Sequence, residues 1–169
     1  GYDVSAAARE AASKAGLHVA TSLALAVDGC SMVLTCLPNS AIVDTVWRGK
    51  DGLHELVGRG VTCVELSSID PDTMKRAASA LQARVASVLD CPVSGSPGEA
   101  LEGKLVLLVG GDAALLQAVA AAVHHQDVVG GHLEAARRRP VVTLQREPLH
   151  GVERLGDVDL EHLLIALVA

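Results

Sequence analysis

Short apolar runs alternate with helix-like segments over residues 1–123. The runs predict strands near residues 17–20, 31–37, 61–66, 84–89 and 104–109. Between them, the spacing of apolar residues predicts helices over 6–15, 22–29, 40–47, 70–83 and 112–123. The run "SMVLTCL" is almost continuously apolar, which is typical of a strand buried on both faces. This alternation predicts an α/β fold, in which a mostly parallel sheet carries helices on both faces.

Several residues are well placed to begin or end these helices. Ser5 can cap the first helix and Gly16 can end it. Pro71 stands at the start of "PDTMKRAASALQ", where its fixed φ suits the first helical turn, and Asp112 can cap the helix that follows it.

Composition and charge exclude some classes of protein. The 169 residues are half apolar and carry a formal charge of −6, so we expect no nucleic-acid partner and no anionic-membrane surface. No apolar run approaches the roughly 18 residues of a membrane span. The four cysteines lack zinc-ligand spacing, so we expect no metal site and free, buried thiols. They indicate a reducing, intracellular compartment, cytoplasmic or mitochondrial.

The composition changes near residue 124. All eleven serines lie at or before Ser96 and all four lysines at or before Lys104, whereas five of the seven histidines lie at or after His124. The change predicts a domain over 1–123 and a divergent, poorly ordered tail over 124–169. Isolated helices are expected there, around 132–139 and 158–168.

Polar loops follow three of the predicted strands. They read "TCLPNS" at 35–40, "ELSSIDP" at 65–71 and "DCPVSGSPGEA" at 90–100. Ligands of open parallel sheets bind at the carboxyl ends of strands, so these loops can line one crevice. The alternative is that each is an ordinary connection, rich in Ser, Gly and Pro as such loops are.

These loops resemble those of the β-hydroxyacid dehydrogenase family. "MVLTCLPNS" is similar to its strand followed by Leu-Pro, and "VELSSIDPDT" to its Asp-x-Ser-Thr-Ile-x-Pro element. "DCPVSGSPGEALEGKLVLLVGGD" resembles its Asp-Ala-Pro-Val-Ser-Gly-Gly pattern and the Gly-x-Leu and Val-Gly-Gly that follow. The family includes 3-hydroxyisobutyrate dehydrogenase, tartronate semialdehyde reductase and the cofactor domain of 6-phosphogluconate dehydrogenase. The resemblance covers residues 1 to about 123.

The resemblance implies an incomplete Rossmann-like, doubly wound sheet. No GxGxxG turn occurs in the sequence, so the chain is expected to begin after that turn and the first strand. The absence of that strand would leave an unpaired edge beside the strand that ends at Leu37.

The resemblance also assigns a site. Ser94, Gly95 and Ser96 would hold a substrate carboxylate, and Ser96 replaces the second glycine of the family's turn. The cofactor NAD or NADP would be contacted by Leu37, Pro38 and Ser68 near the nicotinamide. An alternative role for Ser67 and Ser68 is to cap the helix that begins at Pro71.

Asp3 is the remaining candidate for cofactor binding. As the acid after the second Rossmann strand it would accept hydrogen bonds from the ribose hydroxyls, which favours NAD over NADP. The alternative is a solvated charge near the start of the chain.

The implied function is that of an NAD(P)-dependent oxidoreductase acting on a small 3-hydroxy acid or its semialdehyde. The family's catalytic lysine lies on a later helix, and no lysine follows Lys104 here, so no catalytic residue is assigned. The family's helical oligomerisation domain is not in this sequence either. The chain alone is therefore expected to be inactive, and the alternative function is that of a non-catalytic Rossmann-like binding or interaction module.

Overall fold

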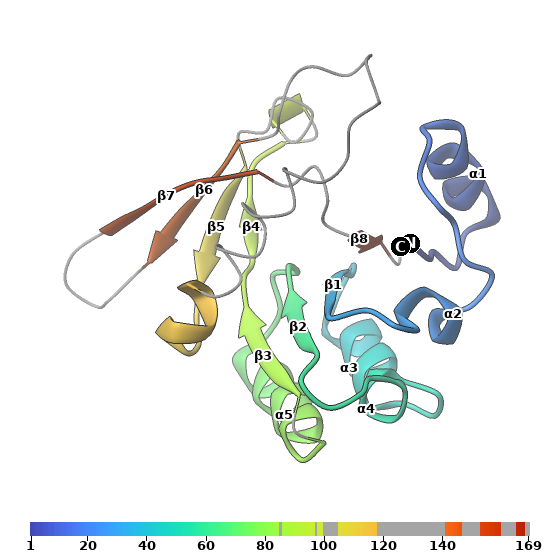
Figure 1. Cartoon of the computed structure of the whole chain (residues 1–169), viewed down its shortest axis with the longest axis horizontal. Helices are drawn as coiled ribbons and strands as arrows, with labels where there is room; N and C mark the ends of the chain where they lie inside the picture. The colour runs from blue at the N-terminus through green and yellow to red at the C-terminus, as the bar shows by residue number, and fades with distance from the viewer. Residues whose placement is uncertain are drawn as a thin grey trace. The chain divides into compact units, whose positions relative to one another are not determined.

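The computed structural model describes residues 1–84, 86–96, 98–99, 105–117, 141–146, 153–159 and 165–167; of the last three ranges it describes the backbone. The chain divides into two compact units, Gly1–Val88 with Leu164–Ala169, and Leu89–Leu163. Figure 1 shows the elements of both. Each unit is described by itself.

The first unit is built on a sheet with strand order β3-β2-β1-β8. Its strands are β1 (Met32–Cys36), β2 (Thr62–Glu65), β3 (Ser87–Asp90) and β8 (Ile165–Leu167). β1 pairs in parallel with β2, so that Thr35 lies opposite Glu65, and also in parallel with β8. A parallel sheet with helical crossovers confirms the predicted α/β class.

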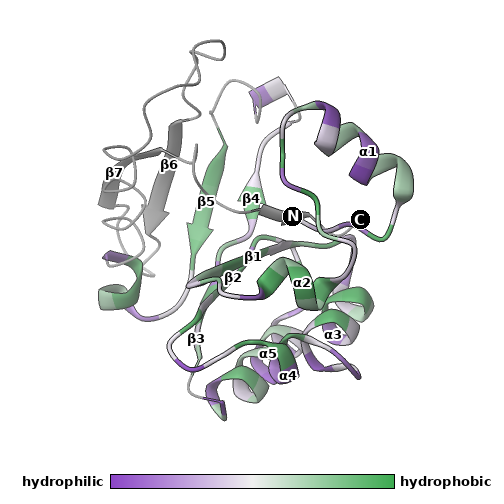
Figure 2. Cartoon of the chain, turned by 45° about the vertical axis from the view of Figure 1, so that its right-hand side comes forward, coloured by the Kyte–Doolittle hydropathy of each residue, from purple (hydrophilic) through white to green (hydrophobic). Residues whose placement is uncertain are grey.

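Among its described residues the first unit has five helices: α1 (Ala6–Lys14), α2 (Leu23–Val27), α3 (Ser40–Arg48), α4 (Leu53–Leu56) and α5 (Pro71–Gln82). The predicted cap of α1 is confirmed, because the Ser5 side chain accepts a hydrogen bond from the Ala8 N–H. Pro71 occupies the first turn of α5 as predicted. Figure 2 shows polar residues among alanines along α1 and a mostly apolar α2; no residue of α1 is buried, whereas α2 buries Ala26 and Val27.

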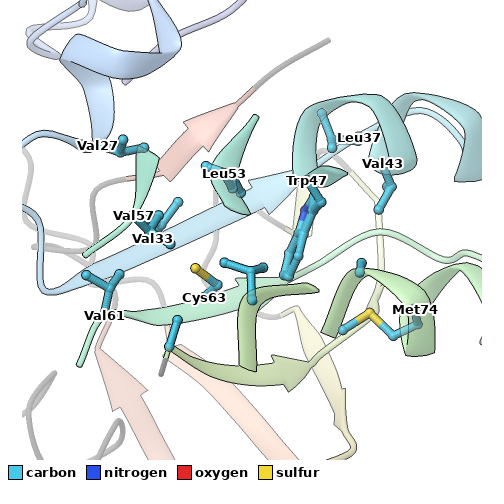
Figure 3. Packing of buried hydrophobic residues seen from close by; sticks show 13 residues of the cluster. Val27, Val33, Leu37, Val43, Trp47, Leu53, Val57, Val61, Cys63 and Met74 are labelled. Atoms are coloured by element: carbon cyan, nitrogen blue, oxygen red, sulfur yellow. The ribbon is translucent and has the colours of Figure 1, made fainter. Parts of the chain in front are cut away.

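The core of the first unit lies between the sheet and helices α3, α4 and α5. Trp47, Leu53 and Leu81 are fully buried there. In Figure 3, Trp47 and Leu53 lie over Val33 of β1 and Cys63 of β2. Burying a side chain of this size contributes roughly 1.5–3 kcal/mol, so this layer holds the ends of β1 and β2 in place.

The second unit contains a sheet of order β4-β5-β6-β7. Its strands are β4 (Val93–Ser94), β5 (Val106–Val109), β6 (Val141–Arg146) and β7 (Glu153–Asp159). β5 pairs antiparallel with β4 and parallel with β6, and β6 pairs antiparallel with β7. Residues 113–117 are helical, and the predicted cap is confirmed because Asp112 accepts a hydrogen bond from the Leu115 N–H.

Two predictions about the first unit are wrong. Residues 17–20 form no strand; two backbone hydrogen bonds join them to Gly1, from the Gly1 amine to His18 and from Ala20 to Gly1. The edge of β1 that was expected to be unpaired carries β8 instead.

Few residues of the predicted tail are described, so only part of its prediction can be compared with the structure. The helix expected around 158–168 is wrong, since β7 ends at Asp159 and Ile165–Leu167 form β8. Short apolar runs such as "LLIALVA" fit a buried helix or a buried strand equally well. The expected helix at 132–139 and the boundary at 123 lie outside the described residues.

Candidate functional site

The loops after β1 and β2 form the candidate site. Because the two strands are parallel and in register, both loops leave the sheet at the same edge. That edge, at the carboxyl ends of the strands, is where open α/β sheets bind their ligands. The first loop carries Leu37 and Pro38, and the second carries Ser67 and Ser68.

Two hydrogen-bonded links join these loops. The Leu37 N–H donates to Ser67 Oγ at 2.5 Å, thirty residues away in sequence. Further out, the Asp70 N–H donates to Ser40 Oγ at 3.2 Å. A hydrogen bond with the Ser40 side chain, followed by those with Thr73, lowers the pKa of the Asp70 carboxyl well below its ordinary value.

Neither Ser67 nor Ser68 caps α5, which was the alternative role considered for them. Asp70 caps α5, because its carboxylate accepts the Thr73 N–H at 2.8 Å. Ser67 is buried and receives the N–H of Leu37. Ser68 is exposed, so its hydroxyl faces solvent at the edge of the sheet.

Leu37 and Pro38 also differ in exposure: the first is buried and the second is exposed. The Leu37 side chain belongs to the core and its N–H is used by Ser67. Pro38 is exposed. The structure thus brings together three of the four predicted cofactor residues and leaves Pro38 and Ser68 as the surface that a ligand would meet. A planar ring can lie against the proline while the serine hydroxyl donates or accepts a hydrogen bond.

A buried polar network supports the two loops from below. Glu65, at the end of β2, is fully buried and accepts hydrogen bonds from Thr35 Oγ1 at 2.6 Å and from the Ser67 N–H at 2.7 Å. The indole N–H of Trp47 donates to Thr35 Oγ1 at 3.1 Å. This network was not predicted from the sequence, although the glutamate at the end of the apolar run "VTCVE" is a signal that could have revealed it.

Asp3 lies apart from these loops, ahead of α1. Its carboxylate accepts the Ser5 N–H at 2.7 Å, and its carbonyl accepts from Arg9, whose guanidinium lies 5.9 Å from the centre of the Tyr2 ring. Asp3 is 6% exposed, so the alternative of a solvated charge is wrong. Asp3, Tyr2 and Arg9 help to line a cavity of about 70 Å³ to which neither loop contributes.

Ser94, Gly95 and Ser96 belong to the second unit and are exposed. Gly95 has φ +145°, and a Cβ on it would lie 2.6 Å from Leu105 Cδ2, so this position requires glycine. The Ser96 N–H donates to Glu99 Oε2 at 2.6 Å and Ser96 Oγ accepts the Glu99 N–H at 3.3 Å. This reciprocal pair is a capping box. The role of these three residues in substrate binding remains a prediction.

Among the described residues, no three His, Cys, Asp or Glu side chains form a cluster suited to a metal ion. Within the same residues no helix is both long and apolar enough to cross a membrane.

Comparison with known proteins decides the family. The model of the NAD-binding domain of 6-phosphogluconate dehydrogenase matches residues 1–126, which include every loop of the first unit described above. The chain belongs to this family. The resemblance seen in the sequence is thereby confirmed, and an NAD-binding domain is its established domain type.

Relatives of this NAD-binding domain include hydroxyacid dehydrogenases. A probable mitochondrial 3-hydroxyisobutyrate dehydrogenase of Dictyostelium discoideum is 38% identical over 96 residues, covering 57% of this chain and 30% of the relative. An NAD-dependent L-serine dehydrogenase of Pseudomonas aeruginosa is 34% identical over 116 residues, covering 69% of this chain and 39% of the relative. The chain thus spans about a third of the length of these curated relatives.

Solved structures agree on the fold. The structure of Mycobacterium tuberculosis 3-hydroxyisobutyrate dehydrogenase with L-serine superposes with a TM-score of 0.66 at 25% identity, covering 70% of this chain and 40% of that one. The Rossmann-like fold class predicted from the sequence is therefore confirmed.

Proposed function

We propose that this chain is the NAD(P)-binding part of an oxidoreductase that acts on a small 3-hydroxy acid or the matching semialdehyde. The observation that carries the proposal is the pair of hydrogen-bonded loops at the carboxyl ends of β1 and β2, which present Pro38 and Ser68 to solvent. Membership of an NAD-binding family supports the cofactor, and the named relatives support the substrate class.

Different residues would bind the cofactor and the substrate. Pro38 and Ser68 would contact the nicotinamide end of the cofactor, and the cofactor would accept the hydride of the hydroxy acid when bound. Ser94, Gly95 and Ser96 would hold the substrate carboxylate through the serine hydroxyl and backbone amides. Asp3, whose carboxylate is buried, would bind the ribose hydroxyls and favour NAD over NADP.

No catalytic residue is assigned within these 169 residues, because the resemblance places the proton-transfer group on a lysine of a later helix and no lysine follows Lys104. Loss of such a group typically costs about 10²–10⁴-fold in rate. A non-catalytic binding module thus remains the second candidate for the 169 residues by themselves.

Cofactor binding can be tested by titrating the chain with NAD and following backbone amide resonances by NMR. We expect the Leu37, Asn39 and Ser68 amides to shift with NAD and with nicotinamide mononucleotide, but not with AMP. Ser68→Ala should weaken the binding, whereas Ser79→Ala, an exposed serine on α5, should not. Equal shifts with AMP, or none at these residues, would contradict the proposed placement of the nicotinamide.

A further inference from the structure

Glu65 is a carboxylic acid placed in the interior of the first unit. It ends β2, it is fully buried, and it packs among Thr35, Trp47 and Ser67. Burying a charged carboxylate costs desolvation free energy unless its oxygens are hydrogen-bonded. The hydrogen bonds to Glu65 must therefore offset that cost.

Ser67 and Thr35 donate hydrogen bonds to this carboxyl group, and Trp47 donates one to Thr35. The Ser67 backbone N–H donates to Oε1. Thr35 Oγ1 accepts the Trp47 indole N–H, and its own hydrogen is then directed at Oε2. An ionised carboxylate accepts only, which matches these donors. Burial raises the pKa of Glu65 above its ordinary value of 4.5, and the hydrogen bonds from Ser67, Thr35 and Trp47 oppose that rise.

The Glu65 carboxyl group is hydrogen-bonded to residues at the start of both candidate cofactor loops. On one side it binds Thr35, two residues before Leu37. On the other side it fixes the backbone of Ser67, the residue before Ser68, and Ser67 Oγ in turn receives the Leu37 N–H. A movement of Glu65 would therefore displace both loops together.

We propose that Glu65 is a positioning residue for the cofactor: through Thr35 and Ser67 it sets the spacing of the loops that present Pro38 and Ser68. It acts through these residues and does not itself contact the ligand. The inference rests on the proposed function, since it requires the loops to bind NAD. Burial, followed by the charge of Glu65, also raises the pKa of the Cys36 thiol on the neighbouring strand β1.

The test compares Glu65→Gln, Glu65→Asp and the wild type for NAD affinity by NMR titration. Gln keeps the shape but replaces one acceptor oxygen by a donor, and we expect about fivefold weaker binding, equivalent to roughly 1 kcal/mol. Asp retains the carboxylate and should restore most of the affinity. Trp47 is the single tryptophan, so its indole N–H resonance reports on the network. It should shift in Glu65→Gln, together with the amides of Leu37 and Ser68.

Leu81→Ala is the control for a merely structural role. Leu81 is fully buried on α5 and belongs to neither loop, so its truncation should destabilise the fold without changing NAD affinity. Equal weakening by Leu81→Ala, or unchanged affinity in Glu65→Gln, would overturn the positioning role while leaving NAD binding intact.

Two further outcomes are informative. A wild type whose loop amides do not respond to NAD would overturn the proposed function, and the role of Glu65 with it. If Glu65→Gln does not fold, Thr35→Val takes its place, because it removes the hydroxyl that donates to Oε2. Unchanged affinity in that variant would refute the proposal.

Discussion

The N–H of Leu37 donates a hydrogen bond to the side-chain oxygen of Ser67, and this bond joins two loops that are separated by thirty residues of sequence. Both partners are buried, so water cannot replace either of them. The neighbouring Ser68 is exposed. Adjacent serines therefore differ in environment: Ser67 joins the two loops, and Ser68 faces solvent.

Ser67→Ala should destabilise the protein. It leaves the buried Leu37 N–H without an acceptor, which costs about 1–3 kcal/mol. Ser68→Ala should change the free energy of unfolding by less than about 0.5 kcal/mol, because its side chain is exposed. Urea unfolding of both variants measures the difference, and equal stabilities would show that the link between the loops contributes nothing.

Gly95→Ala should destabilise the second unit by at least about 2 kcal/mol. The new Cβ would meet Leu105 Cδ2 at 2.6 Å, and the backbone has a φ that side chains rarely adopt. Gly98→Ala is the control three residues further on, because a Cβ there would have Ser96 Oγ as its nearest neighbour, at 3.8 Å. Thermal unfolding followed by circular dichroism tests both, and tolerance of alanine at 95 would contradict the loop conformation.

Asp70→Asn should alter the pH dependence of stability. The pKa of Asp70 is lowered in the folded protein, so the carboxylate stabilises the fold above its ordinary value of 3.8, and that contribution is lost as the pH falls below it. Asn still caps a helix but carries no charge. The melting temperature of the wild type should exceed that of Asp70→Asn at pH 7, and the two should converge in strong acid.

Asp72→Asn is the control for that comparison. Asp72 lies in the same first turn of α5 and is exposed. Its carboxylate pairs with the exposed Lys75 at 3.6 Å. A pH-dependent difference as large as that of Asp70→Asn would mean that general helix charge, not the capping contacts, is responsible.

The cysteines should react in a fixed order. Burial raises the pKa of the Cys63 thiol to about 12, and burial with the charge of Asp90 does the same for Cys91. At pH 8 almost no thiolate exists at either residue, so alkylation should require unfolding. Cys30 is only partly buried and should be modified first. Mass spectrometry after iodoacetamide treatment reads the order, and rapid modification of Cys63 in the native protein would contradict its burial.

The sequence predicts best where local chemistry decides the structure. The apolar runs at 31–37 and 61–66 are strands, and Ser5, Pro71 and Asp112 begin helices, because capping and continuous hydrophobicity act within a few residues. Residues 17–20 and 158–168 were predicted wrongly, because the state of a short apolar run depends on whether a neighbouring strand is available.

The candidate site was predictable only in part. The family resemblance pointed to Leu37, Pro38 and Ser68, but it could not show that Leu37 is buried while Pro38 and Ser68 are exposed. Glu65 escaped notice because its function depends on partners at 35 and 67 that only the paired strands bring near it. Polar networks of this kind are properties of tertiary structure.

The pairing of β1 with two parallel neighbours has a consequence for the order of folding. Its bonds to β2 close a loop of about 30 residues, whereas its register with β8 joins Leu34 to Ile165, on the order of 130 residues away. Contacts of such long range form late, after the entropy of closing the loop has been overcome. Amide hydrogens shared by β1 and β2 should thus be protected from exchange early in refolding, and those facing β8 should be protected last.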